Sequence, residues 1–280
     1  MKWLIAADSA CDLRTLNLQG TDAAYVTVPM RIIADEYEYI DDGREHPGFM
    51  LEALRAGKGL MKKSSTACPS PNDWVRVFEM ADQVIAITAG SRISASYDNA
   101  LAAEELVKGK YPDKKIAVVD SRGIGPFMSL LVYKAKELVR EDIGFEEAQA
   151  RLLTYGSGLE LRAVLASTEN LSKRQKIEKR MKLSKSKETR VLADMSGIFR
   201  YIGKSRSLKD AGLDLLTELA NAGLRDGRVM ITYNGDRRGA LVIANMIHVS
   251  FPESHISMME MGGVCSYYFE DGILVAFEGL

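Results

Sequence analysis

Two clusters of hydroxyl side chains in the first hundred residues suit the binding of an anion. The first is Ser64-Ser65-Thr66, followed by prolines at positions 69 and 71. The second runs from Ser91 to Ser96 and follows the apolar stretch Val84 to Thr88. An ionised carboxylate only accepts hydrogen bonds, and a hydroxyl can rotate to donate one. The two clusters therefore predict one site for an anionic head group, provided that the fold brings them together.

The second cluster occupies the turn between an expected strand and an expected helix. Val84 to Thr88 has the apolar pattern of a buried parallel strand. Residues 93–107 then predict a helix with Ser94 and Ser96 near its start. Such a unit exposes backbone N–H groups at the carboxyl edge of a sheet, where anionic ligands bind. The alternative for Ser94 is a plain helix cap, which serine favours on its own.

Ser94 lacks the surroundings of a catalytic serine. No G-x-S-x-G motif contains it, and no motif places one of the three histidines as its base. Asp8, Asp12 and Asp120 are interpreted as loop-fixing residues, because no phosphate loop accompanies them. The sequence favours a binding protein that is not an enzyme and needs no cofactor or metal. A serine hydrolase stays open as a third hypothesis.

Composition is typical of a soluble globular protein. Of the 280 residues, 27% are charged and 46% are hydrophobic, and the net charge is −1. Bulk charge therefore does not attract nucleic acid or an anionic membrane. The three cysteines form no C-x-x-C pair, which argues against a zinc site or a disulfide framework. No run approaches the ~18 apolar residues of a membrane span, and the apolar run from Trp3 to Ala7 is too short for a signal peptide. These features predict a cytoplasmic protein.

Apolar runs alternate with helical patterns through residues 1–156, which predicts a parallel sheet with flanking helices. A loop is expected over Thr66 to Pro71, with Ser70 capping the next helix. The expected strands are 2–7, 24–29, a strand or hairpin over 31–40, 84–88 and 116–119. The expected helices are 47–56, 71 to about 80, 93–107, 126–141 and 145–154.

A boundary is expected near Tyr155 to Gly158, which divides the chain into domains 1–156 and 157–280. The second domain has the pattern of an α+β domain. Its expected strands are 161–166, 191–194, 198–204, 228–233, 256–260 and 273–278. Its expected helices are 169–180, 207–222 and 237–250.

A basic run extends from Lys173 to Arg190, with nine Lys or Arg residues against two Glu. Such runs are more often a solvated helix face or a docking surface than a nucleic-acid site. No aromatic residue interleaves with this one before Phe199, which argues against stacking on single-stranded nucleic acid. Nucleic acid is therefore an unlikely partner. Together with Arg206, the run also suits an acidic protein partner.

Six segments, taken in chain order, carry a family resemblance: IAADSACDL from Ile5, YVTVPM from Tyr25, TACPSP from Thr66, ITAGSRISASYDNA from Ile87, VVDSRGIG from Val118 and IGKSRSLK from Ile202. They resemble motifs of the DegV family, the bacterial two-domain fatty-acid-binding proteins. The resemblance spans nearly the whole chain. It implies a two-domain α/β fold with the ligand cleft between the domains.

The resemblance also implies a ligand and a partner. Thr66 and Ser94 match the family residues whose hydroxyls hold the carboxylate of a fatty acid. A partner fatty acid kinase would then phosphorylate that carboxylate to an acyl-phosphate. The wall of an acyl tunnel would come from Ile93, Ile124, Phe127, Met128 and Leu131, for each of which core packing is the alternative.

The chain departs from the family pattern near the head group. Tyr268 stands at about the position of a family histidine, in a stretch, 263–272, that replaces a glycine-rich loop. Arg92 replaces a small residue beside the hydroxyl turn. We therefore expect Ser91, Arg92 and Tyr268 to lie near Thr66 and Ser94. The alternative is a divergent member that has lost fatty-acid binding and acts as a partner-binding or regulatory module.

Overall fold

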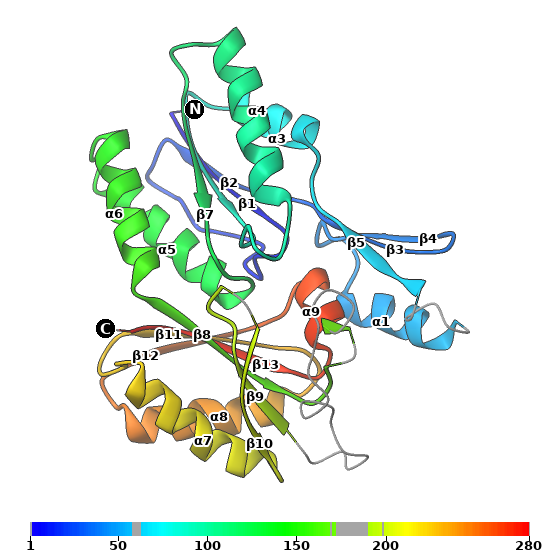
Figure 1. The fold of residues 1–280 in the computed structure, drawn as a ribbon. Helices are drawn as coiled ribbons and strands as arrows, with labels where there is room; N and C mark the ends of the chain where they lie inside the picture. The colour runs from blue at the N-terminus through cyan, green and yellow to red at the C-terminus, as the bar shows by residue number, and fades with distance from the viewer. Residues whose placement is uncertain (1, 58–62, 169, 172–189, 198, 280) are drawn as a thin grey trace.

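The computed structural model describes residues 2–57, 63–168, 170–171, 190–197 and 199–279. In these residues the strands form three sheets. The first sheet is parallel and has the order β2-β1-β6-β7 (Figure 1). Its strands are β1 (Trp3–Asp8), β2 (Ala23–Val28), β6 (Gln83–Thr88) and β7 (Lys115–Asp120).

Helices cover both faces of this parallel sheet, which explains why its central strands read as continuous apolar runs. Helices α3 (Pro71–Phe78) and α4 (Ser96–Lys110) pack on one face. Helices α5 (Pro126–Arg140) and α6 (Phe145–Ser157) pack on the other. All six residues of β1 are buried as a result.

The second sheet has the order β10-β9-β8-β13-β11-β12. Its neighbouring strands are antiparallel except for the parallel pair of β11 and β12. The strands are β8 (Leu159–Leu165), β9 (Arg190–Asp194), β10 (Arg200–Ser205), β11 (Arg228–Tyr233), β12 (His255–Glu260) and β13 (Ile273–Glu278). Helices α7 (Leu208–Asn221) and α8 (Arg237–Ser250) cover its outer face.

Helix α5 lies between the two large sheets and joins their cores (Figure 1). It packs against β1 and β6 of the first sheet and against β8, β11 and β13 of the second. Ten of its fifteen residues are buried. The two domains therefore share one apolar core rather than meeting at a polar interface.

A third, small antiparallel sheet projects from the N-terminal domain and reaches the C-terminal one. It contains β4 (Tyr37–Ile40), β3 (Arg31–Ala34) and β5 (Ser65–Ala67). Helix α1 (Pro47–Ala56) and helix α9 (Gly263–Phe269) lie beside it (Figure 1). Tyr267 of α9 is buried in the same cluster as Ile32 of β3 and Met50 of α1.

The predicted two-domain α/β class is confirmed. Helices 47–56 and 237–250 and strands 228–233 and 273–278 have the expected bounds. Ser70 caps α3 through a reciprocal capping box with Asp73, as its position before a proline predicts. The helix expected over 169–180 and the basic run 173–190 lie outside the described residues, except for residues 170, 171 and 190.

Three expectations near the candidate site are wrong. The helix expected at 93–107 spans Ser96–Lys110, so Ser94 precedes it. The loop expected at 66–71 begins later, because Ser65–Ala67 pair with β3. The stretch 263–272, which replaces a glycine-rich loop of the family, is expected to keep a loop of altered shape but contains the helix α9. The second and third errors arise from contacts with residues far away in the sequence, which a local pattern does not reveal.

Candidate functional site

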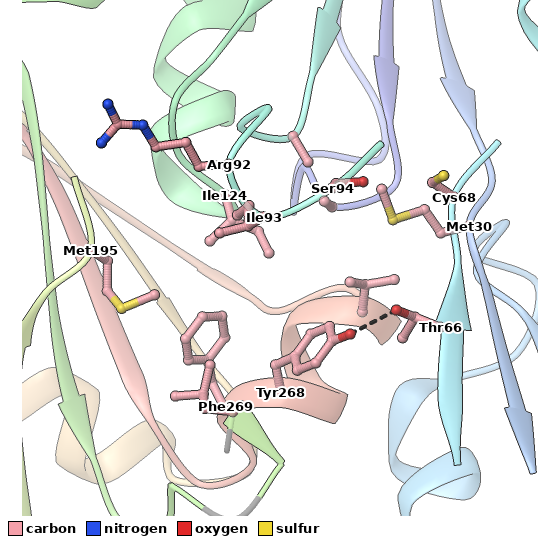
Figure 2. A pocket seen from close by; sticks show the side chains of 14 residues that line it. Met30, Thr66, Cys68, Arg92, Ile93, Ser94, Ile124, Met195, Tyr268 and Phe269 are labelled. Carbon is pink, nitrogen blue, oxygen red and sulfur yellow. Dashed lines mark hydrogen bonds between the residues drawn. The ribbon is translucent and has the colours of Figure 1, made fainter. Parts of the chain in front are cut away.

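The two hydroxyl clusters meet at one cavity of about 200 Å³ between the domains. Thr66 and Ser94 both line it, and so does Tyr268 (Figure 2). The rest of the lining is mainly apolar: Ala10, Met30, Cys68, Ala89, Ile93, Ile124, Leu171, Met195, Val264 and Phe269. The cavity thus combines a few hydroxyl donors with a hydrophobic wall, the usual composition of a site for an amphipathic ligand.

Thr66 is positioned by β5, where it pairs with Ile32 of β3. Its Oγ1 lies 2.7 Å from the hydroxyl of Tyr268, across the cavity wall (Figure 2). The preceding residue, Tyr267, forms a similar bond, with its hydroxyl 2.8 Å from Ser64 Oγ. Consecutive tyrosines of α9 therefore bind hydroxyls of the N-terminal domain, one on the cavity and one beneath it.

Ser94 lies in the turn between β6 and α4. Its backbone N–H donates to the carbonyl of Gly90, at 3.0 Å. Its Oγ accepts from the N–H of Ser96 at 3.2 Å, which is a capping-type contact at the first residue of α4. That contact uses only an acceptor lone pair, so the hydroxyl proton stays available for a ligand.

The turn that carries Ser94 is held by carboxylates at the sheet edge. Asp120 accepts from the backbone N–H and the hydroxyl of Ser91, at 3.0 and 2.6 Å. Asp8 accepts from the N–H of Ala89 at 2.8 Å, and burial raises its pKa from 3.8 to about 6. The prediction that Asp8 and Asp120 fix loops is confirmed.

Gly90 is required by a close approach of two loops. A Cβ at this position would lie 2.9 Å from the carbonyl carbon of Arg122. The Gly90 N–H donates to the carbonyl of Gly123 at 2.9 Å, so the turn and the loop after β7 are joined. A side chain at position 90 would separate them and displace the cavity wall.

Ser91 and Arg92 differ in position from the other three predicted site residues. Ser91 is not part of the cavity lining, and its hydroxyl is already bonded to Asp120. Arg92 lines the rim, with its guanidinium directed away from Thr66 and Tyr268 (Figure 2). The structure therefore brings Thr66, Ser94 and Tyr268 together on one cavity and places Ser91 outside it.

Helix α9, which carries Tyr268, is anchored by two buried carboxylates of the N-terminal domain. Asp41 accepts from the N–H groups of Gly263 and Val264 at 2.9 and 3.0 Å, and it pairs with Arg14 at 2.7 Å. Asp12 accepts from the N–H of Gly262 at 2.8 Å. Burial raises the pKa of Asp12 from 3.8 to about 6.

The apolar wall only partly matches the residues proposed from the sequence. Ile93 and Ile124 line the cavity, whereas Phe127, Met128 and Leu131 lie in the core, in agreement with the core-packing alternative. Several further residues line the cavity that residue type and spacing did not indicate, among them Met30, Cys68, Met195 and Phe269. Met30 follows β2 at the carboxyl edge of the parallel sheet, and this position could have indicated that it lines the site. Met195 and Phe269 carry no local signal, because they reach the cavity from the second domain.

The described residues contain no cluster of His, Cys, Asp or Glu that is suited to hold a metal ion. Cys11 and Cys265 are buried, and Cys68 is half-buried on the cavity wall. None of the helices in the described ranges is both long enough and apolar enough to cross a bilayer.

The family model described as an uncharacterised protein of the DegV family matches residues 2–277. A DegV domain-containing protein of Streptococcus pneumoniae is 30% identical over 290 residues, which cover 99% of both chains.

Solved structures with the same fold cover almost the full length of the chain. A DegV family protein of Eubacterium eligens, loaded with heptadecanoic acid, superposes with a TM-score of 0.92 at 29% identity, over 99% of this chain and 100% of that one. The Streptococcus pneumoniae fatty acid kinase (Fak) B3 protein, loaded with linoleic acid, has the same TM-score and identity over 100% of both chains. On the match to the family model and to these relatives, the chain belongs to the DegV family.

Proposed function

We propose that the protein binds a long-chain fatty acid, with its carboxylate held by Thr66 and Ser94. The observation that carries the proposal is that Thr66 and Ser94 line the same cavity, whose lining is otherwise mainly apolar. The relatives support it, because the Eubacterium eligens protein was loaded with heptadecanoic acid and the pneumococcal protein with linoleic acid.

The head group is held by neutral donors. The hydroxyls of Thr66 and Tyr268 lie 2.7 Å apart, and either of them can be the donor. When Tyr268 donates to Thr66 Oγ1, the Thr66 hydroxyl donates in turn to one carboxylate oxygen. The Ser94 hydroxyl, already an acceptor from Ser96, donates its proton to the same carboxylate. Hydroxyl donors stabilise the anion without neutralising it by direct ion pairing, so the carboxylate keeps its nucleophilic character toward a phosphoryl donor.

The acyl chain lies along Met30, Ile93, Ile124 and Phe269. The cavity of about 200 Å³ is smaller than the roughly 300–1,000 Å³ of common ligand pockets. A full-length chain therefore requires side chains to move. Met30 and Met195 suit that demand, because methionine is unbranched, has three rotatable bonds and adapts to irregular shapes.

The protein acts as a carrier and not as an enzyme, and a partner kinase converts the bound carboxylate to an acyl-phosphate. The name of the pneumococcal relative, a fatty acid kinase protein, supports such a partner. The carrier works in the cytoplasm, where the kinase finds ATP. In this proposal residues 1–156 and 157–280 are the two domains, and the ligand binds in the cavity that residues of both domains line.

Native mass spectrometry of the freshly purified protein, followed by extraction and lipid analysis, tests the proposal. We expect about one fatty acid per chain, bound much less in the double variant Thr66→Val/Ser94→Ala. The matched control Thr66→Ser keeps a hydroxyl and should retain the ligand. A protein that is empty and takes up no added fatty acid contradicts the proposal and favours the partner-binding or regulatory module. Turnover of a chromogenic ester, abolished by Ser94→Ala, would instead reveal a hydrolase.

A further inference from the structure

A fully buried carboxyl group, that of Asp8, lies directly behind the wall of the candidate site. Its Oδ1 accepts from the backbone N–H of Ala10 at 3.1 Å, and its Oδ2 accepts from that of Ala89 at 2.8 Å. Ala10 and Ala89 line the same cavity as Thr66 and Ser94. Two residues of the cavity wall are thus bonded directly to this carboxyl group, which itself has no exposed surface.

No cation is bonded to the Asp8 carboxyl group in the part of the chain that the structure describes. The guanidinium of Arg14 pairs with Asp41 instead. Of the described residues that line the cavity, only Arg92 is charged, and its guanidinium is directed away from the Thr66 hydroxyl (Figure 2). Burial penalises the ionised form and raises the pKa of Asp8 from 3.8 to about 6.

The other ionisable groups near Asp8 come from two loops. The loop after β1 contributes Cys11, Asp12 and Arg14, and the loop after β4 contributes Asp41, whose charge also disfavours the ionised form of Asp8. Burial raises the pKa of Cys11 to about 11, so this thiol stays neutral near pH 6. The elements β2, β6, α4 and α5 bring uncharged side chains to this end of β1, among them Val28, Thr88, Ser96 and Ser129.

A carboxylate held by Thr66 and Ser94 brings a second negative charge to the other side of the Ala10 and Ala89 wall. Repulsion between two carboxylates favours the protonated form of the one that titrates. At an effective dielectric constant of about 20, two unit charges roughly 10 Å apart shift a pKa by about one unit. Ligand charge and the Asp8 proton are therefore linked.

We propose that Asp8 determines the charge specificity of the candidate site, because it takes up a proton from the solvent when a carboxylate binds. The proton forms the O–H bond of Asp8, and the ligand binds with its own charge intact. An anionic head group is favoured while Asp8 is protonated, and a neutral head group such as an alcohol is favoured once Asp8 is ionised. The proposal rests on the proposed fatty-acid function and deepens it.

Isothermal titration calorimetry with dodecanoic acid and 1-dodecanol tests this inference. At pH 6.5, in two buffers of different ionisation enthalpy, we expect the acid to draw roughly half a proton per molecule bound and the alcohol none. The affinity for the acid should fall roughly fivefold from pH 5.5 to 7.5, and that for the alcohol should stay constant. Dodecyl sulfonate, whose head group does not titrate in this range, should also draw a proton, which then comes from the protein alone.

Two variants assign the proton to one residue. Asp8→Asn should abolish the proton uptake. Asp12→Asn is the matched control and should retain it, because Asp12 is also buried, with its pKa raised to about 6, but accepts from Gly262, which does not line the cavity. If Asp8→Asn does not fold, the sulfonate titration of the wild type and of Asp12→Asn still decides whether a protein group other than Asp12 takes up the proton.

The outcomes separate this inference from the proposed function. If dodecanoic acid binds without proton uptake, or if the uptake persists in Asp8→Asn or disappears in Asp12→Asn, the role of Asp8 is wrong and the carrier function stands. If neither dodecanoic acid nor a longer fatty acid binds the wild-type protein at any pH, the carrier function itself fails, and the role of Asp8 fails with it.

Discussion

The hydroxyl of Tyr268 lies 2.7 Å from Thr66 Oγ1, and this hydrogen bond joins the two domains at the cavity wall. Thr66 comes from the small sheet of the N-terminal domain, and Tyr268 from the helix α9 of the other. The orientation of the Thr66 proton therefore depends on a residue 202 positions away in the sequence. The affinity for a ligand that accepts this proton therefore depends on how the two domains are placed.

Tyr268→Phe tests this relationship. We expect fatty-acid affinity to fall roughly three- to tenfold, because a net hydrogen bond contributes about 1 kcal/mol and Thr66 loses the partner that orients it. The matched control is Tyr267→Phe, which removes the neighbouring hydroxyl and its bond to Ser64 away from the cavity. That control should lower the free energy of unfolding by about 1–2 kcal/mol and leave affinity nearly unchanged. Equal loss of affinity in both variants would contradict a specific role for Tyr268.

Ser94→Ala should reduce both affinity and stability, but by different routes. The loss of the proton donor weakens fatty-acid binding about fivefold. The loss of the acceptor for the Ser96 N–H costs about 0.5–1 kcal/mol of unfolding free energy. Ser70→Ala, which removes the α3 cap outside the cavity, should cost about 1 kcal/mol and leave affinity intact. Titration of both variants and urea denaturation distinguish the two effects, and an unaltered affinity for Ser94→Ala would argue for capping alone.

Cys68 provides a probe of occupancy. Burial raises the pKa of Cys11 to about 11 and that of Cys265 well above its usual value, so neither forms a reactive thiolate at neutral pH. Cys68 is half-buried on the cavity wall. We expect N-ethylmaleimide to modify the ligand-free native protein once, at Cys68, and excess heptadecanoic acid to slow that reaction. Peptide mass spectrometry locates the adduct, and Cys68→Ser should abolish it. A labelling rate that does not change when heptadecanoic acid is added would show that the acid binds outside this cavity.

Asp12 should make the protein less stable as the pH rises through 6. Because burial raises its pKa from 3.8 to about 6, the folded chain binds this proton more tightly than the unfolded chain. The stabilisation is complete below about pH 4 and is lost as the pH rises through the folded-state pKa, by up to about 3 kcal/mol. Asp12→Asn keeps the acceptor for the Gly262 N–H and removes the buried charge.

The check on Asp12 is the unfolding free energy of both proteins between pH 4.5 and 8. The unfolding free energy of Asp12→Asn should increase relative to that of the wild type as the pH rises. Asp73 provides a control of opposite sign, since hydrogen bonds from Ser70 lower its pKa. The unfolding free energy of Asp73→Asn should fall relative to that of the wild type only as the pH rises toward about 4 from below, and the difference should stay nearly constant between pH 4.5 and 8. A pH-independent difference for Asp12→Asn would show that its carboxyl is ionised across the range.

Much of the N-terminal domain follows from local pattern. Apolar runs such as Val84 to Thr88 become central strands, and helices such as 47–56 begin at prolines and end before glycine. Thr66 and Ser94 were identified from their residue types, their setting and the family resemblance. Tyr268 was placed near them through its position in a family motif, although its helix was not foreseen.

Residue types and their spacing determined the class of fold, the sheet edge at which the site lies and the hydroxyls that form it. Tertiary structure alone decided that Ser65–Ala67 form a strand, that 263–269 form a helix and that Ser91 points away to Asp120. The physical reason is the range of the forces involved. Strand and helix propensity act over a few neighbouring residues, whereas β5 and α9 depend on partners such as Ile32 and Asp41, which lie 34 and 222 positions away in the sequence.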